Sequence, residues 1–123
     1  MLFTDFYTIL ESHKISPISF GNCVTLNKTH PVFNGHFPEN PITPGVLILQ
    51  IIKNSLEEAL QYPLKLETLS HIKFLQIVDP NKNNILNFQM EIREENEVIK
   101  VKSSSSFPDD TLVLKCNATF VKK

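Results

Sequence analysis

The stretch that decides the fold reads GHFPENPITPGVLILQ and spans residues 35–50. It holds three of the eight prolines and two of the three glycines of the chain. Because proline fixes φ and keeps the preceding residue out of the helical region, residues 36–43 should form a stiff, non-helical loop. Thr43 suits the N-cap of a helix, and Pro44 suits its first position, where a missing N–H costs nothing. We therefore predict a helix from Pro44 to about Gln61.

The first half of this helix lacks a polar face. Gln50 is the single amide in residues 46–52, and the other side chains there are Val, Leu and Ile. A helix that is apolar all round is a buried helix, so we expect it to enter the core with its N-terminus beside the stiff loop. Such an N-terminus offers free N–H groups and a partial positive charge, which suit an anion or a polarised carbonyl. The stretch therefore predicts a place for chemistry on an acyl group.

Length and composition narrow the class of protein. With 123 residues, the chain is expected to form a single domain over residues 1–123. Its 12 basic and 13 acidic residues form no block of like charge, which argues against a nucleic-acid partner. The first residues lack the pattern of a signal peptide, and the longest apolar run, residues 46–52, is far too short for a membrane span. We expect a cytoplasmic protein with no membrane partner.

Nothing in the sequence indicates a cofactor or a metal. Cys23 and Cys116 fall in predicted strands, where cysteines are more often small buried hydrophobes than a bridge or a metal site. No two of the four histidines have the spacing of metal ligands.

The rest of the chain reads as one short helix followed mainly by strands. Apolar residues recur at helical spacing over residues 2–12, which predicts a short amphipathic helix. One strand is expected at residues 18–26, with a bulge or bend at Gly21. The predicted strands after Pro63 cover residues 64–78, 85–92, 98–106 and 112–120, and turns are expected at residues 79–84, 94–96 and 107–110. The serine run at residues 103–106 is typical of a solvated edge, and we assign it no function.

This order of elements predicts an α+β fold, in which a curved antiparallel sheet wraps around one long buried helix. A lone sheet of this size leaves its edge and the far side of the helix exposed. We therefore expect at least a homodimer that extends the sheet.

The layout and one motif resemble the hot-dog fold of the β-hydroxyacyl-acyl-carrier-protein dehydratases of fatty-acid biosynthesis. Their motif, G-H-F-P-x-x-P-x-x-P-G-V-L, matches residues 35–47 at every fixed position. Downstream, residues 72–80 resemble the basic-Phe-x-x-x-Val-x-Pro strand and turn of that family. The resemblance covers most of residues 18–90 and is specific over residues 35–47.

The resemblance implies a set of roles around an acyl thioester of an acyl carrier protein or of coenzyme A. His36 would be the base that removes the C2 proton of a 3-hydroxyacyl thioester. Gly45 and Val46 would offer backbone N–H groups to the thioester oxygen, which gains negative charge as that proton leaves. Phe37 and Pro38 would line the acyl tunnel. In the family, a carboxylate on the helix of the other protomer delivers a proton to the departing hydroxyl.

The sequence departs from the family at that carboxylate, fourteen residues after the histidine, because Gln50 occupies the position. A carboxamide can hold a hydroxyl but cannot donate a proton as a general acid. Loss of such a group typically costs ~10²–10⁴ in rate, or roughly 3–5 kcal/mol of barrier. One turn later, the family's glutamine corresponds to Asn54, so an amide pair is predicted at residues 50 and 54.

Three functions remain open from the sequence. The first is a dehydratase in which Gln50 orients the hydroxyl and His36 both takes and returns the proton. The second is a hot-dog acyl thioesterase, in which amides position a water molecule. The third is a non-catalytic subunit that forms a heterodimer with a second hot-dog chain carrying the carboxylate. A buried amide satisfied by the backbone is as good an interpretation of Gln50 as a substrate contact. For Lys73, contact with an acidic carrier-protein helix or a phosphopantetheine phosphate is weighed against a solvated strand face, which we favour.

Overall fold

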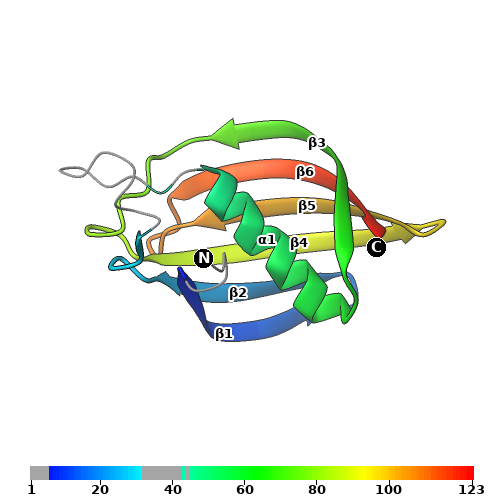
Figure 1. The fold of residues 1–123 in the computed structure, drawn as a ribbon, viewed down its shortest axis with the longest axis horizontal. Coiled ribbons are helices and arrows are strands. Elements are labelled where there is room, and N and C mark those ends of the chain that lie inside the picture. Colours follow the sequence, from blue (N-terminus) through cyan, green and yellow to red (C-terminus); the bar gives the residue numbers. More distant parts are fainter. Residues whose placement is uncertain (1–5, 32–42, 44) are drawn as a thin grey trace.

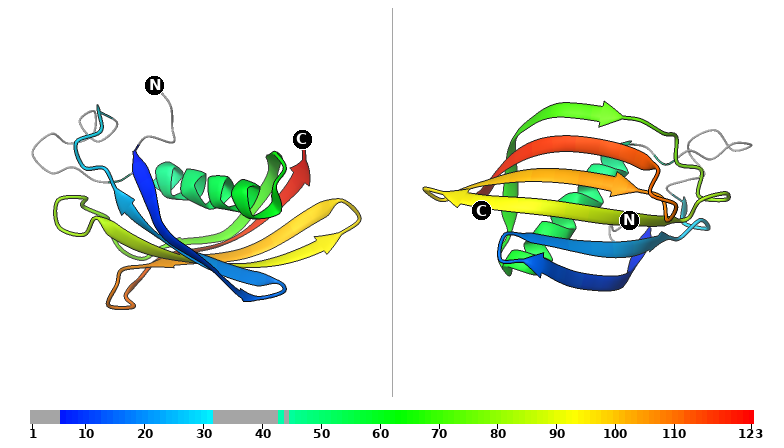
Figure 2. Two further views of the ribbon diagram at one scale, coloured as in Figure 1. Left: turned by 90° about the horizontal axis from the view of Figure 1, so that it is seen from below. Right: turned by 180° about the vertical axis from the view of Figure 1, so that it is seen from behind.

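A computed structural model describes residues 6–31, 43 and 45–123 of the chain. Within them, one curved sheet carries a single α-helix, α1, on its concave face (Figures 1 and 2). The strands run in the order β1-β2-β4-β5-β6-β3, and every neighbouring pair is antiparallel. Their bounds are β1 Tyr7–Ser16, β2 Ser19–Leu26, β3 Leu64–Phe74, β4 Ile85–Glu95, β5 Val98–Ser106 and β6 Leu112–Lys122, and α1 spans Gly45–Leu60. The predicted α+β layout, a curved sheet around one long helix, is confirmed.

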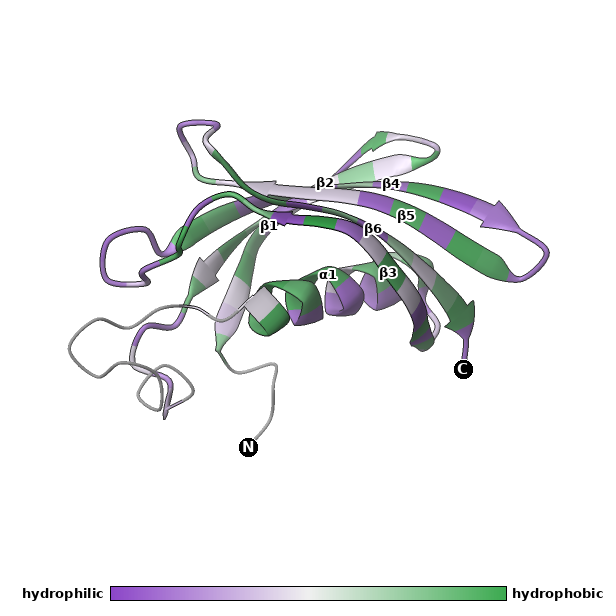
Figure 3. Ribbon diagram, turned by 90° about the horizontal axis from the view of Figure 1, so that it is seen from above, coloured by the Kyte–Doolittle hydropathy of each residue, from purple (hydrophilic) through white to green (hydrophobic). Residues whose placement is uncertain are grey.

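Helix α1 packs one face against the sheet. Its buried residues are Leu47, Ile48, Ile51, Ile52, Ser55 and Leu56, which recur at the helical spacing of three and four. Apolar residues dominate the first half of the helix and polar ones appear toward its end (Figure 3). The expectation that this half is buried all round is wrong for the single chain, because Val46 is 67% exposed. The sheet covers one side of the helix, and no described element covers the other.

The start of the chain was mispredicted. Residues 7–16 form strand β1. The sequence predicted a helix over residues 2–12 instead, and residues 2–5 of that segment lie outside the described residues. Tyr7 and Ile9 pair with Leu26 and Val24 of β2 and pack on the core, while Thr8 and Leu10 are exposed. Apolar residues at positions 6, 7, 9 and 10 fit a helix as well as one end of a strand, and the pairing with β2 decides between them. Two strands therefore precede α1, where the sequence predicted one.

Gly21 does not form the predicted bulge. The pairing of β2 with β4 runs through it without a register shift, and the irregularities lie in β1, between Ile9 and Glu11 and between Lys14 and Ser16. The close approach of β4 explains the glycine. A Cβ at position 21 would lie 2.9 Å from the carbonyl oxygen of Phe88.

The three predicted turns are present. The carbonyl oxygen of Asp79 accepts hydrogen bonds from the N–H groups of Lys82 and Asn83, at 3.0 and 2.8 Å. Asn96 and Glu97 both have positive φ, 50° and 68°, which is the conformation of a two-residue hairpin between β4 and β5. Phe107 donates to the carbonyl of Thr111 in the turn before β6.

The serine run is not a solvated edge. It ends β5, which lies between β4 and β6 in the interior of the sheet (Figure 1). Ser103 and Ser105 point toward the core and are buried, and their Oγ atoms have no hydrogen-bond partner among the described residues. Ser104 and Ser106 alternate with them on the outer face.

Strand β3 is an edge strand whose other side is open. It follows α1 in the chain but pairs with β6, at the far end of the β4-β5-β6 meander. Most of its residues are exposed on both faces. Large apolar side chains are exposed on it and just after it, namely Leu66, Ile72, Phe74, Leu75 and Ile77.

Candidate functional site

The start of α1 is fixed by the end of β3 and the loop after it. The ring of Phe74 lies against Gly45, so that a Cβ at position 45 would meet ring carbons at 2.3 and 2.5 Å. Thr43 donates its N–H to the carbonyl of Val78 at 2.7 Å. The helix can therefore begin here because position 45 has no side chain. Thr43 Oγ1 is buried without a partner among the described residues, so the predicted N-cap hydrogen bond is not formed.

The helix start has backbone N–H groups that no carbonyl of the helix accepts. α1 begins at Gly45, as predicted within one residue. The N–H groups of its first turn, including those of Gly45 and Val46, have no acceptor one turn earlier within the helix. Together with the positive end of the helix dipole, they form a surface suited to a carbonyl oxygen that gains charge.

A chain of three polar side chains runs alongside this start. Gln50 Nε2 donates to Asn54 Oδ1 at 2.8 Å, and Asn54 Nδ2 donates to the Tyr7 hydroxyl at 3.1 Å. The first two lie one turn apart on α1, and the third comes from β1, so the two elements are joined here. The amide of Gln50 is thus bound to another side chain, Asn54, and Asn54 in turn is bound to Tyr7.

The Tyr7 hydroxyl is held in its neutral form. Burial has the largest effect and raises the pKa of this hydroxyl above its usual value. The hydrogen bond from Asn54 lowers the pKa by less than burial raises it, and the nearby charge of Glu58 raises it further. A neutral phenol accepts from Asn54 and keeps its own proton to donate. The chain Gln50–Asn54–Tyr7 therefore carries no charge at neutral pH.

Val46, Gln50 and Asn54 are spaced four residues apart and so form one stripe along α1. The side chains at 50 and 54 are half-buried, while that at 46 is exposed. This stripe places an amide about one turn beyond the free N–H groups. It can hold a hydroxyl or a carbonyl by hydrogen bonds.

Two carboxylates, Glu57 and Glu58, lie near the end of α1. Glu58, one turn after Asn54, lies close enough that its charge adds to the effect of burial on the pKa of Tyr7. Glu57, two turns after Gln50, is engaged elsewhere, because its Oε2 accepts the backbone N–H of Leu64 at 2.7 Å and so caps the start of β3. Within residues 6–31, 43 and 45–123, no three His, Cys, Asp or Glu side chains gather as metal ligands. Cys23 and Cys116 are free thiols.

Four of the seven predicted site residues lie in the described part of the chain. Gly45, Val46, Gln50 and Asn54 share the first three turns of α1. The other three, His36, Phe37 and Pro38, lie outside the described residues. Sequence reasoning missed two contributors, Tyr7 and Phe74. The first was assigned to a helix, and nothing in the sequence pairs the second with Gly45.

The fold has known relatives among solved structures. The dehydratase heterocomplex ApeI:P from Xenorhabdus doucetiae superposes with a TM-score of 0.75 over 93% of this chain and 96% of that chain, at 17% identity. A hypothetical thioesterase with coenzyme A from Streptococcus pneumoniae TIGR4 superposes with a TM-score of 0.68, at 11% identity over 95% of this chain and 85% of that one. The fold is the hot-dog fold, as predicted.

Comparison of the sequence with protein-family models assigns the chain to one family within this fold. A family model described as ApeI-like, ApeI dehydratase, matches residues 15–117, which is most of the chain. This protein belongs to the ApeI-like dehydratase family.

Curated relatives agree with this assignment. FabZ of Caulobacter vibrioides (strain NA1000 / CB15N), a 3-hydroxyacyl-acyl-carrier-protein dehydratase, is 36% identical over 67% of this chain. The match covers 51% of that enzyme, so the chain spans about half the length of this relative. FabZ of Fusobacterium nucleatum subsp. nucleatum is 32% identical over 92% of this chain and 82% of its own length. Separately, no helix in the described ranges is long and apolar enough to span a membrane.

Proposed function

We propose that this protein acts on 3-hydroxyacyl thioesters as a dehydratase, with acyl chains carried by acyl carrier protein or coenzyme A. The observation that carries the proposal is the match to the ApeI-like dehydratase family over residues 15–117, which includes the complete motif of residues 35–47. His36 is the base for the C2 proton, and Phe37 and Pro38 line the acyl tunnel. No cofactor or metal takes part in this chemistry.

The helix start supports the proposed oxyanion site. Removal of the C2 proton places negative charge on the thioester oxygen, and fixed N–H donors stabilise such charge without reorganisation. Gly45 and Val46 supply these N–H groups. The Phe74 ring lies on the side of Gly45 where a Cβ would be.

Gln50 orients the hydroxyl that leaves. One of its N–H groups is used by Asn54, so its carbonyl oxygen and its second N–H are available to substrate. The carbonyl oxygen of Gln50 accepts a hydrogen bond from the 3-hydroxyl group and so fixes the direction of the C–O bond. An amide cannot protonate the leaving oxygen, so within one chain His36 returns the proton that it removed.

A partner chain is the second part of the proposal. The chain has an unpaired edge at β3, exposed apolar side chains on and just after that strand, and an exposed Val46 on α1. A second copy paired along β3 would cover them and form a homodimer or a larger homo-oligomer.

A heterodimer with a second hot-dog chain is the alternative assembly, and it implies a second candidate function. Gln50 favours it, because a chain without the acid gains most from a partner that carries a carboxylate at this helix position. The X. doucetiae neighbour, the dehydratase heterocomplex ApeI:P, supports such an arrangement for this chain. In this case the protein is the subunit that contributes His36, or only scaffold, to a heteromeric dehydratase.

The test uses the purified chain with a 3-hydroxyacyl thioester, and follows the absorbance of the conjugated enoyl product. We expect turnover by the wild type, loss of turnover in His36→Ala, and a rise of at least tenfold in Gln50→Glu, because an acid at this position restores ~10²–10⁴ in rate in favourable geometry. Gln61→Glu is the matched control, since it makes the same change just beyond the end of α1 and should leave the rate unaltered.

The same assay separates the other candidates. Release of free thiol without a conjugated product, dependent on His36 or Gln50, would replace the dehydratase by an acyl thioesterase. An inert pure chain that becomes active only after addition of a second hot-dog chain would assign the subunit role. Unchanged dehydration rates in both His36→Ala and Gln50→Glu would refute the proposed site.

A further inference from the structure

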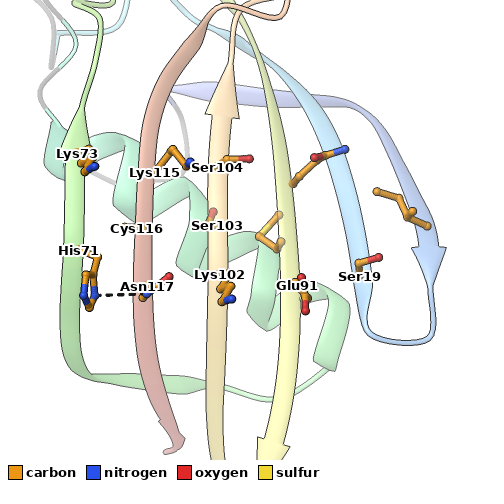
Figure 4. Close-up of a pocket in the computed structure, with 13 residues that line it drawn as sticks. Ser19, His71, Lys73, Glu91, Lys102, Ser103, Ser104, Lys115, Cys116 and Asn117 are labelled. Carbon is orange, nitrogen blue, oxygen red and sulfur yellow. Dashed lines mark hydrogen bonds between the residues drawn. The ribbon is translucent and has the colours of Figure 1, made fainter.

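The outer face of the sheet, opposite α1, carries a shallow basin of about 640 Å³. Most of its polar side chains come from the four neighbouring strands β3, β6, β5 and β4, and Ser19 of β2 lies at its margin (Figure 4). We define this outer basin by His71, Lys73, Lys102, Ser104, Lys115 and Asn117, which point outward in the figure. None of these residues belongs to the site at the start of α1.

Two lysines in the basin oppose each other directly. Lys73 of β3 and Lys115 of β6 are register partners in an antiparallel pair. Residues that face each other in this way have Cβ atoms about 4.5–5.5 Å apart, and like charges there destabilise the sheet. Neither lysine forms an ion pair with any described carboxylate. The like charges are therefore uncompensated within the described chain.

The neighbours of this pair are hydrogen-bond donors rather than acids. Ser104 is the register partner of Lys115 on β5, and Asn117 lies two residues further along β6. Glu91, the nearest carboxylate in the basin, is the register partner of Lys102. Lys102 thus has a carboxylate as register partner, while Lys73 and Lys115 have none.

An irregular backbone brings an imidazole to the basin in addition to its lysines. The register of β3 against β6 shifts between Ser70 and Lys73, and His71 has a φ of 52°. A positive φ is costly for a residue other than glycine, and bulges of this kind re-aim side chains. His71 Nδ1 lies 3.4 Å from Asn117 Nδ2 and 3.2 Å from Ser70 Oγ. The bulge thus places an imidazole beside the two lysines on the same face.

We infer that the outer basin binds a phosphate group carried by a small organic ligand, held between Lys73 and Lys115 with His71, Ser104 and Asn117 as further donors. Lysine binds phosphate as a point charge, whereas planar carboxylates are matched better by the fork of arginine. The basin is within the size range of small-molecule pockets and larger than a phosphate alone needs. This inference does not rest on the proposed function.

The test is a titration of the full chain with tripolyphosphate and, separately, with ATP, at constant ionic strength, followed by backbone amide NMR. We expect saturable shifts at residues 71, 73, 104, 115 and 117. Tighter binding of ATP would show that an organic body also occupies the basin, and equal binding would show that the phosphates alone are held. The first result supports the inference in full, and the second keeps the phosphate site but overturns the organic ligand.

Variants make the assignment specific. Lys73→Gln and Lys115→Gln should each raise the dissociation constant at least tenfold. Lys100→Gln is the matched control, because Lys100 is an exposed lysine of the same sheet, on β5, that lies outside the basin and pairs with Glu95 at 3.4 Å. It should change the dissociation constant by less than threefold. Without ligand, Lys73→Gln should melt above the wild type, since it removes the like-charge contact.

Several results would overturn the inference. They are the absence of saturable shifts with either ligand, shifts that lie outside the basin, and equal weakening by Lys100→Gln and Lys73→Gln. The last would indicate general attraction to a basic surface rather than a site.

Discussion

The contact between Phe74 and Gly45 gives the sharpest stability prediction, because it reverses the sign of one substitution. Gly45 has no positive φ, so alanine is compatible with its backbone. At such a helical position, Gly→Ala stabilises a protein by about 0.5–1 kcal/mol. In the wild type, however, the new methyl group would lie 2.3 and 2.5 Å from carbons of the Phe74 ring.

The ring has to move, and the cost can be bounded. Phe74 is 55% exposed, so its ring can rotate outward and lose the packing of its covered half. Full burial of a phenylalanine is worth about 1.5–3 kcal/mol, which makes the loss about 1–2 kcal/mol when residual crowding is included. We therefore expect Gly45→Ala to lower the free energy of unfolding by about 0.5–1 kcal/mol in the wild type. In a Phe74→Ala background it should raise that free energy by about 0.5–1 kcal/mol.

The assay is urea unfolding of the four proteins of this double-mutant cycle, repeated at several protein concentrations so that any assembly along β3 is separated from the contact itself. A coupling energy of about 1–2 kcal/mol is expected. Equal effects of Gly45→Ala in the two backgrounds would show that the ring does not lie on the helix start.

Three further predictions concern the described core. Gly21→Ala should lower the free energy of unfolding by about 2–3 kcal/mol, more than Gly45→Ala, because the methyl group meets the carbonyl of Phe88, which cannot rotate away; an equal cost in urea unfolding would contradict this. Ser105→Ala should raise the free energy of unfolding by about 1 kcal/mol, since it removes a buried hydroxyl without a described partner. Ser55→Ala should lower it by about 1–2 kcal/mol, because Ser55 forms hydrogen bonds with Asn22 and with the carbonyl of Ile51. The reverse order of the two effects in urea unfolding would contradict these hydrogen-bond assignments. The raised pKa of Tyr7 predicts stability that is fully present below pH 10 and lost as pH rises through that pKa, and the loss should be smaller in Tyr7→Phe; parallel stability curves at alkaline pH would refute the burial of this phenol.

The helix and the meander were predictable because local signals and tertiary structure agree there. The prolines and glycines of residues 35–45 set where the helix begins, and alternation of apolar residues sets which faces of β4 and β6 are buried. The hairpin at Asn96 follows from residues that tolerate positive φ.

The rest depends on contacts between distant parts of the chain. Strand β1 could not be told from a helix, because only its pairing with β2 makes Tyr7 and Ile9 neighbours of the core. The placement of β3 beside β6, and with it the bulge at His71, results from the path of the chain after α1. In the candidate site, the closeness of Gln50 and Asn54 follows from their spacing of four residues on a helix. The hydrogen bond from Asn54 to Tyr7 depends on how β1 packs beside α1, which the sequence does not reveal.

The most direct test of the proposed chemistry is the rate at which the purified wild-type chain converts a 3-hydroxyacyl thioester into the conjugated enoyl thioester, compared with His36→Ala. We expect the conjugated product to accumulate with the wild type and not with the variant. Equal rates for the two proteins, or thiol release with no conjugated product, would contradict dehydration by this site.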